Sequence, residues 1–271
     1  NSQFLGSSSP VFGETVRANR TDFDGNGTSD LIWRNASSGL AGIWLMNGTS
    51  VSSVAALPTV SDPQWEIQGA GDLNGDGGLD LVWRNTSSGL SGVWLMNGSS
   101  VSAVVSLPAV ADTRWRIVAV ADMDGDGLPD LVWRNTVTGD NEFWRMNGTV
   151  PVAVVPLPAV SDTNWEIVGA ADFDGDGMND LVWRNRSNGL NAIWTMSGAS
   201  IHSIVPLPTV ADANWSIVSI GDFNQDGKPD LVWHDRVNGL SGIWLMNGTA
   251  ISSVVSLPSV SDPAWVLAGP R

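Results

Sequence analysis

The sequence predicts an all-β fold, a five-bladed β-propeller with four antiparallel strands in each blade and a ring closed by the C-terminal strand. Two observations carry this prediction. A unit of 50 residues occurs five times without an insertion or deletion, and no part of the unit has a helical pattern. A unit of short strands that are apolar on both faces has to pack between neighbours, and radial closure allows this without long free edges.

Three columns of tryptophan, each spaced by 50 residues, define the repeat and contain all fifteen tryptophans of the chain. The columns are Trp33, Trp83, Trp133, Trp183 and Trp233; Trp44, Trp94, Trp144, Trp194 and Trp244; and Trp65, Trp115, Trp165, Trp215 and Trp265. Tryptophan at fixed positions of a propeller most often packs between blades. We expect this role above all for the first two columns, which fall in mid-strand.

Four strands are expected in each unit. The first, WEIVGAADF from Trp165, is a continuous apolar run, typical of a strand buried on both faces. The second, DLVWRN, follows an acidic loop. The third reads GVWLMNG around Trp94, and Asn97-Gly98 at its end indicates a two-residue hairpin. The fourth, SAVVSLPAV from Ser102, contains Pro108, which has no backbone donor, so we expect this strand at the outer edge.

The two ends of the chain predict how the ring closes. The segment before the first acidic loop, TVRANRTD, aligns with the first strand of the second unit but carries Arg17 and Arg20 at positions that should be buried. The C-terminal residues 265–269 fit the strand pattern well. We therefore expect them to complete the first blade beside residues 30–35.

The expected organisation is an N-terminal arm or tail over residues 1–14 and a single propeller domain over residues 15–271. The 50-residue repeats of this domain begin at about residues 22, 72, 122, 172 and 222. An alternative is that the five units are part of a larger ring.

Five acidic loops share an oxygen-bearing side chain at positions 1, 3, 5 and 9, with glycine at position 6. Hard cations prefer several such oxygens, and glycine permits the tight turn that gathers them. A backbone carbonyl at position 7 would add a ligand. The candidate calcium ligands, about one ion per blade, are Asp22, Asp24, Asn26 and Asp30; Asp72, Asn74, Asp76 and Asp80; Asp122, Asp124, Asp126 and Asp130; Asp172, Asp174, Asp176 and Asp180; and Asp222, Asn224, Asp226 and Asp230.

These loops differ from EF-hands, because position 12 is a tryptophan in place of the bidentate glutamate and the flanks are strands. We expect an affinity in the micromolar to millimolar range, which fills the sites only outside the cell. An alternative is that the loops are simply good turns. The occurrence of the pattern in all five units argues against this, and so does the repulsion that carboxylates would have without a cation. The fifth loop, with Asn224 and Gln225, should be among the weaker sites.

The pattern DxDxDGxxDLVW in a repeated all-β unit resembles the FG-GAP/VCBS repeat of integrin-type propellers and many bacterial surface proteins. The resemblance covers about 250 of the 271 residues. It implies a calcium-dependent propeller in extracellular adhesion or recognition, and a fungal seven-bladed lectin of this blade type binds sugars. Rings of this family usually have seven blades, so five is a departure.

The strand directions place a second set of candidate residues on the face opposite the acidic loops. Indole faces stack on sugar rings, and Arg and Asn reach hydroxyls, so this face predicts a repeated carbohydrate site. The alternative is that the arginines hydrogen-bond loop carbonyls and stack on indoles. The candidates are Trp65, Trp115, Trp165, Trp215 and Trp265 with Arg34-Asn35, Arg84-Asn85, Arg134-Asn135 and Arg184-Asn185; the fifth unit has His234-Asp235.

Composition excludes several classes of function. A formal charge of −15, with seventeen of the twenty-eight carboxylates in the five loops, argues against nucleic acid and anionic membrane surfaces. There is no cysteine and no apolar run long enough to span a membrane. We do not expect an enzyme, since neither histidine lies in a catalytic motif. The third unit departs from the pattern at residues 140–145, which is either drift or a specialised site.

The preferred interpretation is a secreted or cell-surface bacterial lectin that is stabilised by calcium and binds glycans or glycoproteins at repeated sites. The alternative is an adhesion or scaffold module that binds a protein partner or serves as an accessory domain of a larger surface protein.

Overall fold

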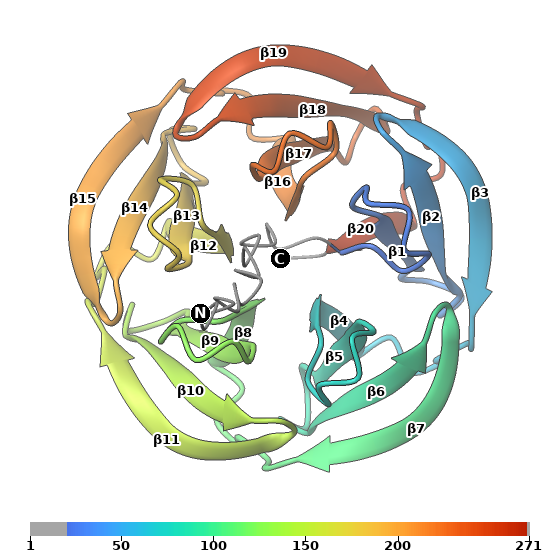
Figure 1. Ribbon diagram of the computed structural model, residues 1–271, viewed down its shortest axis with the longest axis horizontal. Coiled ribbons are helices and arrows are strands. Elements are labelled where there is room, and N and C mark those ends of the chain that lie inside the picture. The colour runs from blue at the N-terminus through green and yellow to red at the C-terminus, as the bar shows by residue number, and fades with distance from the viewer. Residues whose placement is uncertain (1–20, 270–271) are drawn as a thin grey trace, which may run out of the picture.

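The computed structural model describes residues 21–269 as five four-stranded antiparallel sheets arranged around a central axis (Figure 1). The predicted all-β, five-bladed propeller is therefore confirmed. The expected arm, residues 1–14, lies outside the described residues, as do Arg17 and Arg20. No helix among the residues described here is long and apolar enough to cross a membrane.

The strands of each blade are given from the innermost to the outermost. Blade 1 contains β20 (Trp265–Gly269), β1 (Leu31–Asn35), β2 (Ala41–Asn47) and β3 (Ser50–Leu57). Blade 2 contains β4 (Trp65–Gly71), β5 (Asp80–Asn85), β6 (Ser91–Asn97) and β7 (Ser100–Leu107). Blade 3 contains β8 (Trp115–Ala121), β9 (Asp130–Asn135), β10 (Asn141–Asn147) and β11 (Val150–Leu157). Blade 4 contains β12 (Trp165–Ala171), β13 (Asp180–Asn185), β14 (Asn191–Ser197) and β15 (Ser200–Leu207). Blade 5 contains β16 (Trp215–Gly221), β17 (Asp230–Asp235), β18 (Leu240–Asn247) and β19 (Ala250–Leu257).

Burial follows the position of a strand in its blade. The second strands are buried at every residue, because both of their faces are covered by neighbouring blades. The outermost strands alternate between exposed and half-buried residues. Each apolar cluster combines two successive blades; Ile32 and Ile43 of blade 1, for example, pack with Leu81 and Trp83 of blade 2.

The C-terminal strand closes the ring as the sequence predicts. Strand β20 pairs with β1, with Trp265 opposite Asn35 and Leu267 opposite Trp33. The innermost strands contact one another in the closed order β4, β8, β12, β16 and β20. The five blades thus form a complete circle in themselves (Figure 1).

Three expected details shift by one or two residues. The innermost strand of blade 4 ends at Ala171, because the loop begins earlier than the apolar run suggests. The hairpin between β6 and β7 is Gly98-Ser99, since Asn97 still pairs with Ser100. Gly98 has a φ of 56°, which suits the first position of a type II′ turn. Strand β7 starts at Ser100 and ends just before Pro108, so the proline follows the edge strand.

Candidate functional site

The acidic loops join the innermost strand to the second strand in blades 2 to 5, and in blade 1 the loop directly precedes the second strand, β1. The carboxylate at position 1 organises each loop. In blade 1 the backbone N–H groups of Gly25 and Gly27 donate to Asp22 at 2.7 and 2.6 Å. Gly25 and Gly27 have φ angles of 74° and 86°, a region that favours glycine. The next three loops along the chain repeat both hydrogen bonds.

The carboxylate at position 9 is fully buried and ties the loop to the third strand. Asp30 Oδ1 accepts a hydrogen bond from the Met46 N–H at 2.8 Å, and Oδ2 accepts one from the Phe23 N–H at 2.7 Å. These two bonds give aspartate at this position a structural role in every blade. The other carboxylates with the same pair of bonds are Asp80, Asp130, Asp180 and Asp230.

The side chain at position 5 folds back onto its own loop, where its oxygen accepts a hydrogen bond from the backbone N–H at position 7. This bond is 2.8 Å for Asn26 and 2.9 Å for Asp126. The remaining members with this bond are Asp76, Asp176 and Asp226. The second oxygen accepts a hydrogen bond from the position 3 amide in blades 2 and 5, at 2.8 Å for Asp76 and 3.0 Å for Asp226.

Carboxylate oxygens converge in three of the loops. Within each group the oxygens at positions 1, 3 and 9 lie within 4.8 Å of one another. The groups are Asp22, Asp24 and Asp30; Asp122, Asp124 and Asp130; and Asp172, Asp174 and Asp180. The loops of blades 2 and 5 have Asn74 and Asn224 at position 3, where an amide oxygen is a neutral ligand of the same kind. Hard oxygen donors at this spacing fit a cation such as calcium.

Burial raises the pKa of the position 9 carboxyl groups. The pKa of Asp30 and of Asp180 is raised to about 7, and that of Asp130 and of Asp230 to about 6. Burial also raises the pKa of Asp80. Repulsion from the other carboxylates of the loop adds to the effect, and the two backbone N–H groups oppose it. These carboxylates therefore need a proton or a cation near neutral pH.

Two loops contain features that oppose a bound cation. In blade 3, Arg145 Nε lies 3.7 Å from Asp124 Oδ2. In blade 5, Gln225 has a φ of 63° where the other loops have glycine, and Lys228 Nζ donates to Asn247 beside the loop. A nearby positive side chain competes with a metal ion, so these loops have the less favourable surroundings.

The three tryptophan columns meet on one face of each blade. The rings of Trp33 and Trp44 lie 4.7 Å apart, and the corresponding pairs in the other blades are 4.5 to 4.8 Å apart. The Trp33 column is buried, whereas the Trp44 and Trp65 columns are half-buried. The expected packing role of the Trp33 column agrees with this burial.

In two blades the three tryptophans line a pocket, which we call the three-tryptophan pocket. In blade 1 a pocket of about 380 Å³ is lined by Trp33, Trp44 and Trp265 with Gly42. In blade 5 the same columns, Trp233, Trp244 and Trp215 with Gly242, line a pocket of about 260 Å³. The buried indole Nε1 atoms of Trp33 and Trp233 have no hydrogen-bond partner among the described residues. The same atom is buried and unpaired in the other three blades, so it is common to the Trp33 column, and what distinguishes the pockets is their aromatic walls.

Blade 3 differs at the glycine position. Glu142 replaces the glycine, and the Trp144 Nε1–H group donates to Glu142 Oε1 at 3.2 Å. Blade 4 has Ala192 there, and blade 2 has Gly92. The departure in the third unit thus places a carboxylate among the tryptophans of that blade.

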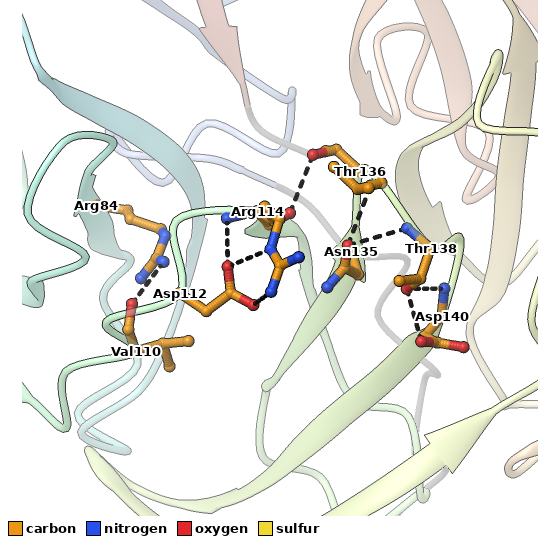
Figure 2. Close-up of polar contacts among 9 residues, drawn as sticks. Arg84, Val110, Asp112, Arg114, Asn135, Thr136, Thr138 and Asp140 are labelled. Atoms are coloured by element: carbon orange, nitrogen blue, oxygen red, sulfur yellow. Dashed lines mark hydrogen bonds and ion pairs between the residues drawn. The ribbon is translucent and has the colours of Figure 1, made fainter.

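The arginines expected to contact a ligand are used within the protein. Arg84 donates to the carbonyl oxygens of Gly89 and Val110, and its guanidinium lies 4.8 Å from the Trp133 ring centroid in the next blade (Figure 2). Their exposed fractions are at most 3%. The alternative role is present throughout this column: Arg34, Arg84, Arg134 and Arg184 donate to loop carbonyls and stack on indoles. Ligand contact by these arginines stays a prediction, and Arg134 and Arg184 also line a cavity at the start of the innermost strands.

The asparagines that follow these arginines are also occupied. Asn85 Oδ1 accepts hydrogen bonds from the Ser87 and Ser88 N–H groups, which closes the turn after the second strand. In Figure 2 Asn135 makes the same contact with Thr138. At most 7% of each of these residues is exposed, so their observed role is to hold the turn, and ligand contact stays a prediction for Asn35, Asn85, Asn135 and Asn185.

The Trp65 column lies where the innermost strands begin, on the face opposite the acidic loops, as the strand directions predict. Trp215 and Trp265 reach three-tryptophan pockets. Sequence reasoning missed that all three columns share these pockets. One signal in the sequence could have located these pockets: the position between the tryptophans is glycine at residues 42 and 242 but glutamate at residue 142.

The sequence model described as the FG-GAP-like repeat matches four overlapping segments of the chain, residues 22–83, 72–133, 122–183 and 172–233. Each match runs from one acidic loop to the second-strand tryptophan of the following unit. Together they cover residues 22–233, well over half of the chain. No curated protein sequence is significantly similar to it.

Several solved structures share parts of the fold. The chain is 15% identical to a Photorhabdus luminescens Tc holotoxin pore, with a TM-score of 0.45, over 77% of this chain and 12% of the toxin chain. It is 12% identical to a chain of a nidogen/laminin complex, with a TM-score of 0.49, over 89% and 97% of the two chains. It is 10% identical to an auxiliary nutrient binding protein from Bacteroides thetaiotaomicron, with a TM-score of 0.46, over 89% and 63%. At this level of similarity the comparisons carry no information about ligand or partner.

Proposed function

Because the chain belongs to the FG-GAP-like repeat family, we propose that it is a calcium-stabilised binding module whose three-tryptophan pockets bind carbohydrate. We place it outside the cell, either secreted or at a bacterial surface. The pockets are the observation that carries the proposal, since each gathers three indoles around a space suited to a monosaccharide.

The calcium part of the proposal rests on the loop carboxylates. The side chains at positions 1, 3, 5 and 9 and the carbonyl oxygen of position 7 would hold the ion in each blade. A bound calcium ion would neutralise carboxylates that burial and mutual repulsion destabilise. Because each loop leads into the second strand and is hydrogen-bonded to the third through position 9, the expected role is structural.

The extracellular location follows from the expected affinity. Position 12 of each loop is a tryptophan of the Trp33 column, so the bidentate glutamate of high-affinity EF-hand loops is missing. Sites of micromolar to millimolar affinity are filled where calcium is abundant, which is outside cells.

The carbohydrate part of the proposal rests on pocket chemistry. Indole rings offer flat apolar surfaces to the C–H faces of a sugar, and the half-buried indoles of Trp44 and Trp265 in blade 1 and of Trp244 and Trp215 in blade 5 have surface to offer. Pockets in more than one blade would give avidity for a glycan with several terminal sugars.

The test is a glycan array in calcium buffer, followed by titration of the best glycan against wild type and Trp265→Ala. We expect the substitution to remove binding in blade 1 while the melting temperature stays close to that of wild type. Trp115→Ala is the matched control, because Glu142 already occupies that side of blade 3. Absence of any glycan binding at millimolar concentration would overturn the carbohydrate proposal.

One observation supports the alternative, a module that binds protein. Each outermost strand exposes a large apolar side chain at the same position, with exposed fractions of 56 to 66%. These side chains are Val54, Val104, Val154, Ile204 and Val254. A ring of apolar residues on edge strands suits contact with another protein. Capture of a partner by wild type, lost when two adjacent valines are changed to threonine, would favour this function over a lectin.

A further inference from the structure

The centre of the ring contains a cavity of about 570 Å³ that none of the preceding assignments uses. Its lining residues come from the beginnings of the innermost strands of blades 2 to 5, on the face opposite the acidic loops. The volume lies within the range of small-molecule sites.

The lining of this central cavity has the opposite charge to the protein as a whole. Five of the thirteen basic residues line it, together with two carboxylates, Glu66 and Glu166, while the chain carries a formal charge of −15. A cavity with an excess of positive charge concentrates anions within an otherwise acidic molecule. The five are Arg116, Arg134, Arg184, Arg186 and Arg236.

Arg116 stands out in this group because one of its guanidinium nitrogens has no hydrogen-bond partner among the described residues. It belongs to β8, and its Nη1 atom is buried without a hydrogen-bond partner in the part of the chain described. Arg134 and Arg184, by contrast, donate to loop carbonyls, and Arg186 lies 3.1 Å from Glu166. Because the Arg116 side chain is half-buried and lines the cavity, an anion bound there is a candidate acceptor for its guanidinium.

The charge of Arg116 also acts on a buried neighbour, Arg84. Burial lowers the pKa of Arg84 to about 10, and repulsion from Arg116 is the next cause. Glu66 and Glu166 occupy the same strand position as Arg116 in the blades on either side. Neither lies within ion-pair distance of Arg116 among the described residues, so its fork of donors is open to a carboxylate.

The remaining lining residues favour a sugar acid over a simple inorganic anion. Trp165 and Trp215 are half-buried and present indole surface to the cavity, which suits a sugar ring. The two glutamates accept hydrogen bonds from hydroxyl groups. They also oppose a doubly charged phosphate or sulfate more strongly than a single carboxylate.

We infer that the central cavity binds a hexuronate, with its carboxylate on the guanidinium of Arg116, its ring against Trp165 or Trp215 and its hydroxyls toward Glu66 or Glu166. This site shares no residue with the three-tryptophan pocket of blade 1, although Trp215 also lines the pocket of blade 5, and it goes beyond the proposed function. Either assignment can therefore fail while the other stands.

The test is calorimetric titration of the full chain with D-glucuronate and D-glucose at constant ionic strength, with sulfate as a competitor. We expect glucuronate to saturate one site. Glucose should bind at least about tenfold more weakly, because it lacks the carboxylate and so loses at least one charge-assisted hydrogen bond. Arg116→Ala should weaken glucuronate binding by at least about tenfold, and Arg116→Lys should restore only part of it, because lysine lacks the fork. Glu66→Gln should strengthen binding by removing an opposing charge.

Arg114→Ala is the matched control. It removes the same charge two residues away, but Arg114 pairs with Asp112 at 2.8 Å outside the cavity (Figure 2). This variant and Trp265→Ala should bind glucuronate as wild type does. Unchanged glucuronate affinity in Arg116→Ala would overturn the inference. Sulfate that displaces glucuronate at equal concentration would also overturn it, since the site would then select an anion without a sugar ring.

Discussion

The guanidinium of Arg84 lies 4.8 Å from the centroid of the Trp133 ring, across the boundary between blades 2 and 3. The same side chain donates to a hairpin carbonyl of its own blade and to the loop that crosses to the next blade. Three further boundaries repeat this arrangement, at distances of 4.9 to 5.4 Å. At the fifth boundary His234 meets the edge of Trp33 at 5.6 Å. Arginine is therefore the contact that joins successive blades, except where the ring closes.

The first prediction concerns this contact. Arg84→Ala should lower the free energy of unfolding by about 3 kcal/mol, since it removes charge-assisted hydrogen bonds and a desolvated cation–π contact and leaves buried carbonyls without donors. Urea denaturation followed by tryptophan fluorescence measures the change. Arg114→Ala is the control, because the Arg114–Asp112 pair is exposed and its loss should leave the midpoint almost unchanged. Equal midpoints for Arg84→Ala and wild type would show that the blades do not depend on the contact.

The second prediction concerns the closing boundary. His234 Nδ1 lies 2.9 Å from Ser241 Oγ, where Arg84 reaches Ser91 Oγ at 3.2 Å in blade 2. His234→Arg should therefore adopt the arrangement of the other blades and stabilise the ring by about 1 kcal/mol. We expect the melting temperature to rise by about 2–4 °C in a protein of this size. A lower melting temperature would show that the closing interface cannot accommodate the longer side chain.

The pH dependence of wild type provides an independent check on His234. Burial holds the pKa of His234 below its usual value of 6.5, with Arg236 acting in the same direction and Asp235 against it. The folded state therefore resists protonation, and stability is lost as the pH falls from 6.5 toward the folded-state pKa. In excess calcium, this loss should be present in wild type and absent in His234→Arg. Parallel pH profiles for the two proteins would contradict the assignment.

Strand order and closure could be predicted because they depend on local pattern. The apolar run after Trp165 and the poor fit of Arg17 and Arg20 were enough to place β20 beside β1. The roles of Arg34 and its equivalents could not be decided, because the same Arg-Asn ending suits a surface site or a buried contact. Only the position of Trp83 in the neighbouring blade distinguishes the two, and that contact depends on how the blades pack.

The three-tryptophan pockets and the central cavity could not be predicted from the sequence for the same reason. A pocket formed by Trp33, Trp44 and Trp265 brings together residues from three strands and both ends of the chain. Arg116 looks like an ordinary variation of the position held by Glu66 and Glu166. Its importance depends on burial and on the absence of an acceptor among the described residues, neither of which is readable from spacing.

The third prediction concerns calcium removal. At a calcium concentration about 100 times the Kd, each occupied site contributes about 2.7 kcal/mol. Chelation should then lower the melting temperature by more than about 10 °C. Calorimetry with and without chelator checks this, and magnesium at the same concentration is the control ion, because its small size demands a stricter geometry. An unchanged melting curve in chelator would contradict the structural role.

The sign of the pH effect in chelator follows from the position 9 carboxyl groups. Their folded-state pKa values of about 6 to 7 exceed the unfolded value of 3.8, so the folded state binds more protons. Their contribution is fully present below pH 3.8 and is lost as the pH rises through 6 to 7. The chelated protein should therefore melt at a higher temperature at pH 5.5 than at pH 8, and the stabilisation by added calcium should shrink at the lower pH. A chelated protein that is most stable at pH 8 would contradict the burial of uncompensated carboxylates.

The last prediction exchanges the glycine and glutamate that distinguish two blades. Gly242→Glu should close the pocket of blade 5 and reduce the number of bound sugars by one, because in blade 3 Glu142 places its carboxylate on the Trp144 indole. The added Cβ would lie 3.1 Å from the Val255 carbonyl oxygen, so Gly242→Ala is the control for this crowding alone. Glu142→Gly should do the reverse and add one sugar site in blade 3. Calorimetric stoichiometry with the best glycan measures both changes, and melting curves confirm folding. If neither exchange alters the stoichiometry, the sugar does not occupy the space between the three indoles.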